Sequence, residues 1–222
     1  MDRTQLSRPR RMPGGAFAAL AVADALLAAA PARWQRARVV TKPLLMPTLA
    51  TRARLAPQRR QLVAAQAFSW GGDVALLGRS RASFLAGVGS FVGAHLAYIS
   101  AFRARSSAPV LDTPGRRRFL AAGGLLAAGM GLAAAREDRA VAVPVAAYGV
   151  ALAAMVAASA AVDGDRSEVL GGAALFLASD ALLGIRTFIV GEERRGSAAL
   201  EGLVMATYTA AQWRLGEGLA RR

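Results

Sequence analysis

Two aspartates stand out in this sequence because each lies in the middle of a long apolar stretch. Asp73 falls within residues 68–77 and Asp180 within residues 172–183, where most of the neighbours are Ala, Gly, Leu, Val and Phe. An ionisable group in a membrane-spanning helix is energetically expensive, so it usually has a function. When two carboxyl groups share a buried site, one tends to keep its proton, which provides an acid and a base for hydrolysing an acid-labile bond. The pair therefore predicts acid–base catalysis if both residues belong to one site.

Other polar residues fall at helical spacing on the segments around these aspartates. Ser69 precedes Asp73 by four residues, and His95 and Tyr98 share a helical face with Phe91. Lipid would penalise each polar stripe, so the stripes must face the interior of a bundle and form a polar pocket there. With Asp73 and Asp180 as the catalytic pair, the residues expected to bind substrate are Lys42, Ser69, His95, Tyr98, Tyr208 and Gln212.

Structural roles compete with these assignments. An aspartate or a tyrosine inside a bundle can simply hydrogen-bond two helices together, and His95 can be a packed, hydrogen-bonded residue. Lys42 either pairs with a carboxylate or extends to the membrane interface. Asp24 interrupts the first apolar segment without polar support in its own helix. Arg186 and Glu201 lie nearer the ends of their segments, so we expect them to pair at the surface.

The composition is typical of a polytopic helical membrane protein. Of 222 residues, 55% are hydrophobic and 19% are charged, against about 45–50% and about 25% in soluble domains. The charges occur in short clusters between long apolar runs. The net charge of +14 comes from arginines at the ends of apolar segments. These fit topology signals and contacts with anionic membrane lipids, and no motif indicates a nucleic-acid partner.

Several kinds of site are excluded by the residues present. The chain has no cysteine and a single histidine, which rules out disulfides, thiolate chemistry and a His-rich zinc site. There is no G-x-S-x-G elbow, P-loop, dinucleotide-binding glycine pattern or H-E-x-x-H motif. We therefore predict a site that uses neither a metal nor a cofactor.

Eight apolar segments, separated by short polar loops, must position these residues. The second segment contains Pro43 and Pro47, which we expect to kink it. The sequence predicts an all-α, polytopic transmembrane helix bundle with about eight spans. The predicted segments are 14–30, 39–51, 62–78, 84–102, 119–135, 141–162, 170–190 and 198–215.

The domain organisation follows from these segments. We expect residues 1–13 to form a basic cytoplasmic segment, 14–217 a single transmembrane domain, and 218–222 a basic C-terminal tail. The first segment resembles a signal peptide but serves better as an uncleaved first helix. Arginines are more numerous on the side that carries both termini, which places the termini in the cytoplasm. The bias toward Ala and Arg is typical of a high-GC bacterium, so the expected location is the inner cell membrane.

Five motifs occur in order along nearly the whole chain. They are KPLLMP at 42–47, FSxxGD at 68–73, FxxGxxxFxxAHxxY at 84–98, GAxLFxxSD at 172–180 and TYxxAQ at 207–212. Together they resemble the YhhN-like family of eight-span membrane proteins, which includes the lysoplasmalogenases. The resemblance implies hydrolysis of the vinyl ether bond of a lysophospholipid, giving a fatty aldehyde and a glycerophospho-base.

This reaction suits a pair of carboxyl groups. Protonation of the alkenyl carbon gives an oxocarbenium ion, which the second carboxylate can stabilise until water captures it. The main alternative is a proton-coupled carrier, since the segments around Asp73 and Asp180 are faintly alike and transporters often contain internal repeats. A non-catalytic membrane scaffold is a third possibility, but it would not need so many inward polar stripes.

Overall fold

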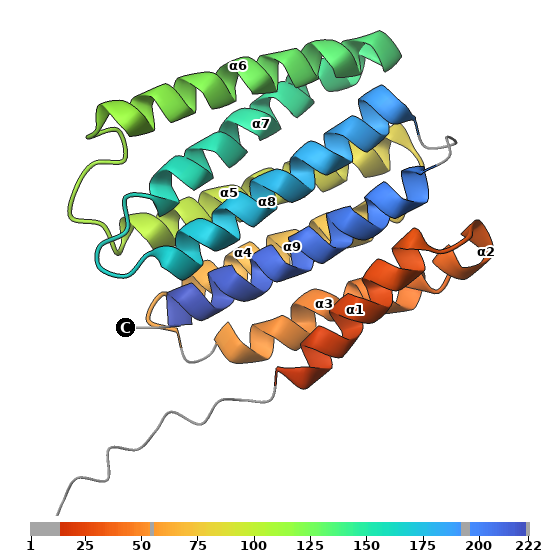
Figure 1. Ribbon diagram of the computed structural model, residues 1–222, viewed down its shortest axis with the longest axis horizontal. Coiled ribbons are helices and arrows are strands. Elements are labelled where there is room, and N and C mark those ends of the chain that lie inside the picture. The colour runs from red at the N-terminus through yellow and green to blue at the C-terminus, as the bar shows by residue number, and fades with distance from the viewer. Residues whose placement is uncertain (1–13, 54–55, 192–195, 221–222) are drawn as a thin grey trace, which may run out of the picture.

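Helices make up all the regular structure in the part of the chain that the computed structural model describes, residues 14–53, 56–191 and 196–220. This confirms the all-α prediction. The helices lie side by side along the length of the molecule (Figure 1). They are α1 (Gly15–Ala29), α2 (Ala32–Gln35), α3 (Arg38–Ala53), α4 (Arg59–Ala75), α5 (Arg81–Arg103), α6 (Pro114–Glu137), α7 (Arg139–Ser159), α8 (Ser167–Ile185), η1 (Arg186–Val190) and α9 (Ser197–Ala220).

The helices close into a ring. Contacts run from α1 to α3, α4, α5, α7, α8 and α9 in that order, and α9 packs back against α1. Helix α6 stays outside the ring, where it packs on α7 and on η1. In Figure 1, α6 lies along one edge of the bundle, and α1 and α3 lie along the opposite edge. Side chains from each ring helix can therefore meet in one interior, whereas those of α6 cannot.

Within the described part of the chain, four helical segments are long and apolar enough to cross a membrane: α5, α6, α7 and residues Ser167–Val190. Helix α1 is apolar but has 15 residues. Helices α3 and α4 have 16 and 17 residues, and each contains three charged side chains, which lowers its hydropathy. A membrane protein is thus supported, and the count of eight spans with cytoplasmic termini stays a prediction. Helix α9 runs on to Ala220, so it includes part of the predicted tail, and the predicted segment 1–13 lies outside the described residues.

Helix α3 is continuous through Pro43 and Pro47, where we expected an irregular backbone. Pro47 has no N–H to donate to the carbonyl of Pro43. The indole Nε1 of Trp70 on α4 donates to that carbonyl at 3.0 Å, so the freed acceptor is satisfied by the neighbouring helix. With 16 residues, α3 is about 24 Å long at 1.5 Å per residue.

Short side chains and caps fix the helices against each other. A Cβ at Gly172 of α8 would lie 2.9 Å from the backbone nitrogen of Leu215 and 3.1 Å from the carbonyl oxygen of Ala211, so α8 and α9 approach closely there. Asp138 caps α7 by accepting a hydrogen bond from the backbone N–H of Ala140 at 2.9 Å. These contacts hold the ring in register around its polar interior.

Candidate functional site

Asp73 lies near the end of α4 and faces the interior of the ring, with an exposed fraction of 2%. Its carboxylate accepts a hydrogen bond from the hydroxyl of Tyr208 on α9 at 2.7 Å. The ammonium of Lys42 on α3 lies 3.6 Å from the other carboxylate oxygen. Gly72 leaves room for the ring of Phe91, which a Cβ would meet at 2.5 Å. Asp73 therefore has a cationic partner and a hydroxyl partner inside the bundle.

Asp180 approaches the same interior from α8, where it is partly buried. The hydroxyl of Tyr148 on α7 donates a hydrogen bond to one of its carboxylate oxygens. Among the described residues, Asp180 has no cationic partner of the kind that Lys42 gives Asp73. Contacts between aromatic rings connect Tyr148 to Tyr208, the tyrosine that holds Asp73. The structure thus places both aspartates at one polar interior, which sequence alone could only presume.

Aromatic rings fill the space between the two aspartates. His95 on α5 is fully buried, with its ring centroid 5.1 Å from that of Tyr148 and 5.0 Å from that of Phe176. The ring of Phe176 lies 5.5 Å from that of Tyr208. Neither ring nitrogen of His95 has a hydrogen-bond partner among the residues that the structure describes. The rings thus connect the Tyr208–Asp73 pair to the Tyr148–Asp180 pair.

A second polar layer lies one to three helical turns away from the aspartates. The hydroxyl of Tyr98 donates to Gln212 Oε1 at 2.6 Å, and Gln212 Nε2 donates to the hydroxyl oxygen of Ser69 at 2.9 Å. All three residues are buried. The structure therefore gathers every predicted site residue in the ring, although Ser69, Tyr98 and Gln212 contact each other rather than the carboxyl groups.

A charged cluster beyond Lys42 was missed by the sequence analysis. Arg38 on α3 lies 3.4 Å from Asp24 on α1 and 2.8 Å from Glu201 on α9, and Arg186 lies 3.3 Å from the second oxygen of Glu201. Thr41 donates to Asp24 at 2.5 Å.

This cluster corrects two expectations. The side chains of Glu201 and Arg186 are only 13% and 16% exposed, so they do not pair at an open surface. Asp24 is fully buried and has partners from a neighbouring helix. The sequence feature that could have indicated this cluster is the spacing of Arg38 and Lys42, which are four residues apart on one face of α3.

Phe84 begins the motif that contains Phe91 and His95, but its side chain lies away from the site. Its ring packs edge-on against Phe188 of η1, with centroids 6.4 Å apart, in a smaller cluster with Val141 and Val145. Phe84 stands seven residues before Phe91, which places it about 10 Å away along the axis of α5 at 1.5 Å per residue, beside η1 instead of the aspartates.

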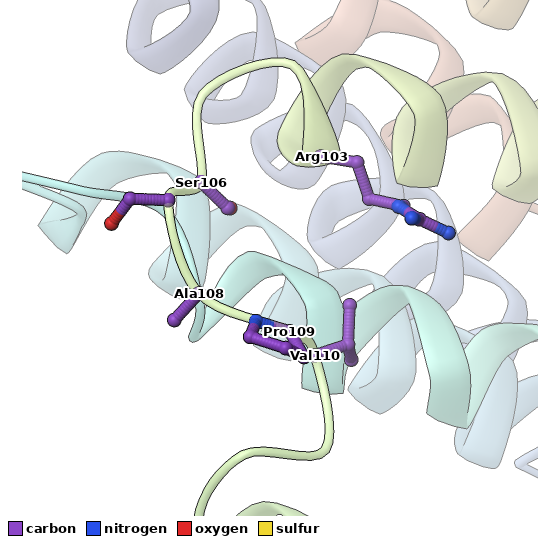
Figure 2. A pocket seen from close by; sticks show the side chains of 6 residues that line it. Arg103, Ser106, Ala108, Pro109 and Val110 are labelled. Atoms are coloured by element: carbon purple, nitrogen blue, oxygen red, sulfur yellow. The ribbon is translucent and has the colours of Figure 1, made fainter.

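The described residues contain no group of three or more His, Asp and Glu side chains placed to bind a metal ion. A hollow does occur between α5 and α6, where one loop supplies the lining (Figure 2). The residues that line it are Arg103, Ser106, Ser107, Ala108, Pro109 and Val110. They include no carboxylate, so the hollow lacks the chemistry that the ring interior has.

Comparison with known proteins identifies the family. No curated protein and no solved structure matches the chain. The family model described as the YhhN family matches residues 37–219, a range that includes α3 to α9 almost completely and every residue of the candidate site. The chain therefore belongs to the YhhN family of membrane proteins.

Proposed function

We propose that the protein hydrolyses the vinyl ether bond of lysoplasmalogen-type lysophospholipids, releasing a fatty aldehyde and a glycerophospho-base. The observation that carries this proposal is the convergence of Asp73 and Asp180 on one interior with different partners. A reaction through a short-lived cation needs one group that donates a proton and another that stays negative. The two environments fit that division of roles.

Asp180 is the proton donor in this mechanism. A carboxyl group without a cationic partner in a low-dielectric interior favours its neutral form, and Tyr148 fixes its orientation. Asp180 transfers its proton to the alkenyl carbon, and the π electrons of the double bond form the new carbon–hydrogen bond. The positive charge that results is shared by the ether oxygen and the carbon beside it.

Asp73 stabilises this oxocarbenium ion. Lys42 and Tyr208 hold the carboxylate in its charged form and in one orientation. A fixed negative charge needs little reorganisation when the positive charge develops, which is the usual source of electrostatic catalysis. The phosphate of the head group would then lie toward Lys42 and Arg38, the two cationic residues in the first half of α3.

The test is aldehyde release by the full chain in lipid nanodiscs supplied with an alkenyl lysophospholipid. Asp180→Asn and Asp73→Asn should each lower kcat by at least about 100-fold, the range that acid–base groups contribute. Asp112→Asn, in the exposed loop before α6, is the matched control and should keep full activity. Aldehyde release that survives both interior substitutions would contradict the carboxylate mechanism.

A proton-coupled carrier is the second candidate. The observation in its favour is that polar side chains continue through the ring, from Glu201 and Lys42 past Asp73 to Gln212 and Gln66. A carrier would release no aldehyde from any lysolipid, and it would acidify vesicles when its solute is supplied. These two results together would contradict the proposed hydrolysis and favour transport as the function.

A further inference from the structure

The ring of His95 is an unexplained feature at the centre of the site. It is fully buried, and neither Nδ1 nor Nε2 has a hydrogen-bond partner in the structure. A neutral imidazole carries one donor and one acceptor, and leaving both unpaired in an apolar interior is costly. Buried polar groups of this kind are normally satisfied by water or by a ligand. The ring therefore marks a position where a small polar molecule binds.

The neighbours of His95 indicate which molecule that is. Tyr148 holds Asp180, and Phe176 contacts Tyr208, which holds Asp73. His95 thus lies between the proton donor and the cation-stabilising carboxylate. Asp73 is already engaged by an ammonium and a hydroxyl, whereas His95 has both nitrogens available. A base at this position can activate water without giving up the negative charge that the cation needs.

We propose that His95 binds the nucleophilic water and accepts its proton, an inference that rests on the proposed vinyl ether hydrolysis. The water oxygen forms a bond to the carbon beside the ether oxygen, and one water proton moves to the imidazole. The imidazole returns this proton to the ether oxygen as the carbon–oxygen bond breaks. The remaining hydroxyl of the hemiacetal gives its proton back to Asp180, which leaves an aldehyde and a free glycerol hydroxyl.

Hydrogen exchange separates this role from a structural one. In D₂O the wild-type protein captures each cation with water, so unreacted substrate should stay free of deuterium. In His95→Gln and His95→Phe the protonation step by Asp180 is intact but capture is slow. The cation then returns a proton, and recovered substrate acquires deuterium at the alkenyl carbon. Aldehyde release should fall at least about 100-fold with KM little changed.

The controls make the result decisive. Ser90 lies on the same helix as His95, and its hydroxyl donates to the Phe68 carbonyl, away from the aspartates. Ser90→Ala should therefore behave as wild type. If His95 only supports packing, or if its variants misfold, aldehyde release and deuterium exchange fall together in both variants. That result, or unchanged hydrolysis in both His95 variants, overturns the assignment.

A measurement without turnover uses the fact that the chain has a single histidine. Protein labelled with ¹⁵N-histidine should give one imidazole spin system, with a cross-peak to water that a non-hydrolysable alkyl ether lysolipid perturbs. If the imidazole gives no cross-peak to water and the protein still releases aldehyde, the water site is overturned but the proposed hydrolase activity is not. A hydrated ring in a protein that releases no aldehyde overturns the hydrolase and, with it, the catalytic role of His95.

Discussion

The pair formed by Lys42 and Asp73 provides the most direct test of how the interior is charged. Their charged atoms are 3.6 Å apart, and the side chains are only 8% and 3% exposed. At an effective dielectric constant of about 20, two unit charges at this distance attract by about 5 kcal/mol. Desolvation offsets part of that attraction, but removing one partner of a buried pair still costs about 3–5 kcal/mol because the other charge is left unpaired. Lys42→Met should therefore destabilise the protein by about 3 kcal/mol.

A double-mutant cycle isolates this interaction. Lys42→Met, Asp73→Asn and the double variant are unfolded in mixed micelles with increasing denaturing detergent, and the free energy of unfolding is compared. We expect the double variant to be less destabilised than the sum of the single variants by about 2–4 kcal/mol. The pair of Arg116 and Asp112, whose carboxylate is exposed, is the control, with an expected coupling of a few tenths of a kcal/mol, roughly that of surface i, i+4 pairs. Additive effects at Lys42 and Asp73 would show that Asp73 is neutral, and its electrostatic role in catalysis would fail.

Three further substitutions test the packing and the caps. Gly172→Ala should lower the free energy of unfolding by about 1–3 kcal/mol because the new Cβ meets the backbone of α9. Gly124→Ala is the control and should be neutral or stabilising, since a Cβ there has open space. Equal effects in the same unfolding assay would refute the close approach of α8 and α9. Gln212→Leu should cost about 2 kcal/mol, since it leaves Tyr98 and Ser69 without their partner, and a loss no larger than that of Tyr98→Phe would argue against the network. The hydrogen bond from the Ala140 N–H, and then that from Arg81, lower the pKa of Asp138. The stability that ionised Asp138 contributes is therefore present at neutral pH and disappears as the pH falls through that lowered pKa. Asp138→Ala should lower the melting temperature at neutral pH but not in strong acid, and a pH-independent loss would contradict this.

Hydrophobic patterning was sufficient to predict the described helices other than the short α2, which lies in a predicted loop. The eight predicted segments correspond to α1, α3, α4, α5, α6, α7, α8 with η1, and α9, with ends that shift by a few residues. Two details required tertiary information. Helix α3 passes through its prolines because Trp70 of α4 supplies the missing donor, and α9 runs to Ala220 because Gly218 packs against Val169 of α8.

The site was predictable residue by residue, but its arrangement was not. Polar residues in apolar segments must face inward, and this rule alone selected Asp73, Asp180 and their companions. Periodicity assigns a residue to a face of its own helix, yet it cannot say which helices are neighbours. Asp24 was undervalued because its partners come from α3, and Glu201 because Arg38 reaches it across the ring. The packing of α1 on α3 brings Asp24 to Arg38, and the packing of α9, which is far away in sequence, against α1 and α3 brings Glu201 there.

Charge balance within the ring explains why the two aspartates differ. On one side of the interior, Arg38, Arg186 and Lys42 pair with Asp24, Glu201 and Asp73, so these charges compensate one another. Asp180 stands apart from this set and has a neutral tyrosine as its partner. In a low-dielectric interior, a negative charge on Asp180 beside an already balanced cluster would have a higher free energy than the protonated, neutral carboxyl group. In the proposed mechanism the cluster missed in the sequence therefore matters for the chemistry, because it favours Asp73 as the charged carboxylate and Asp180 as the proton donor.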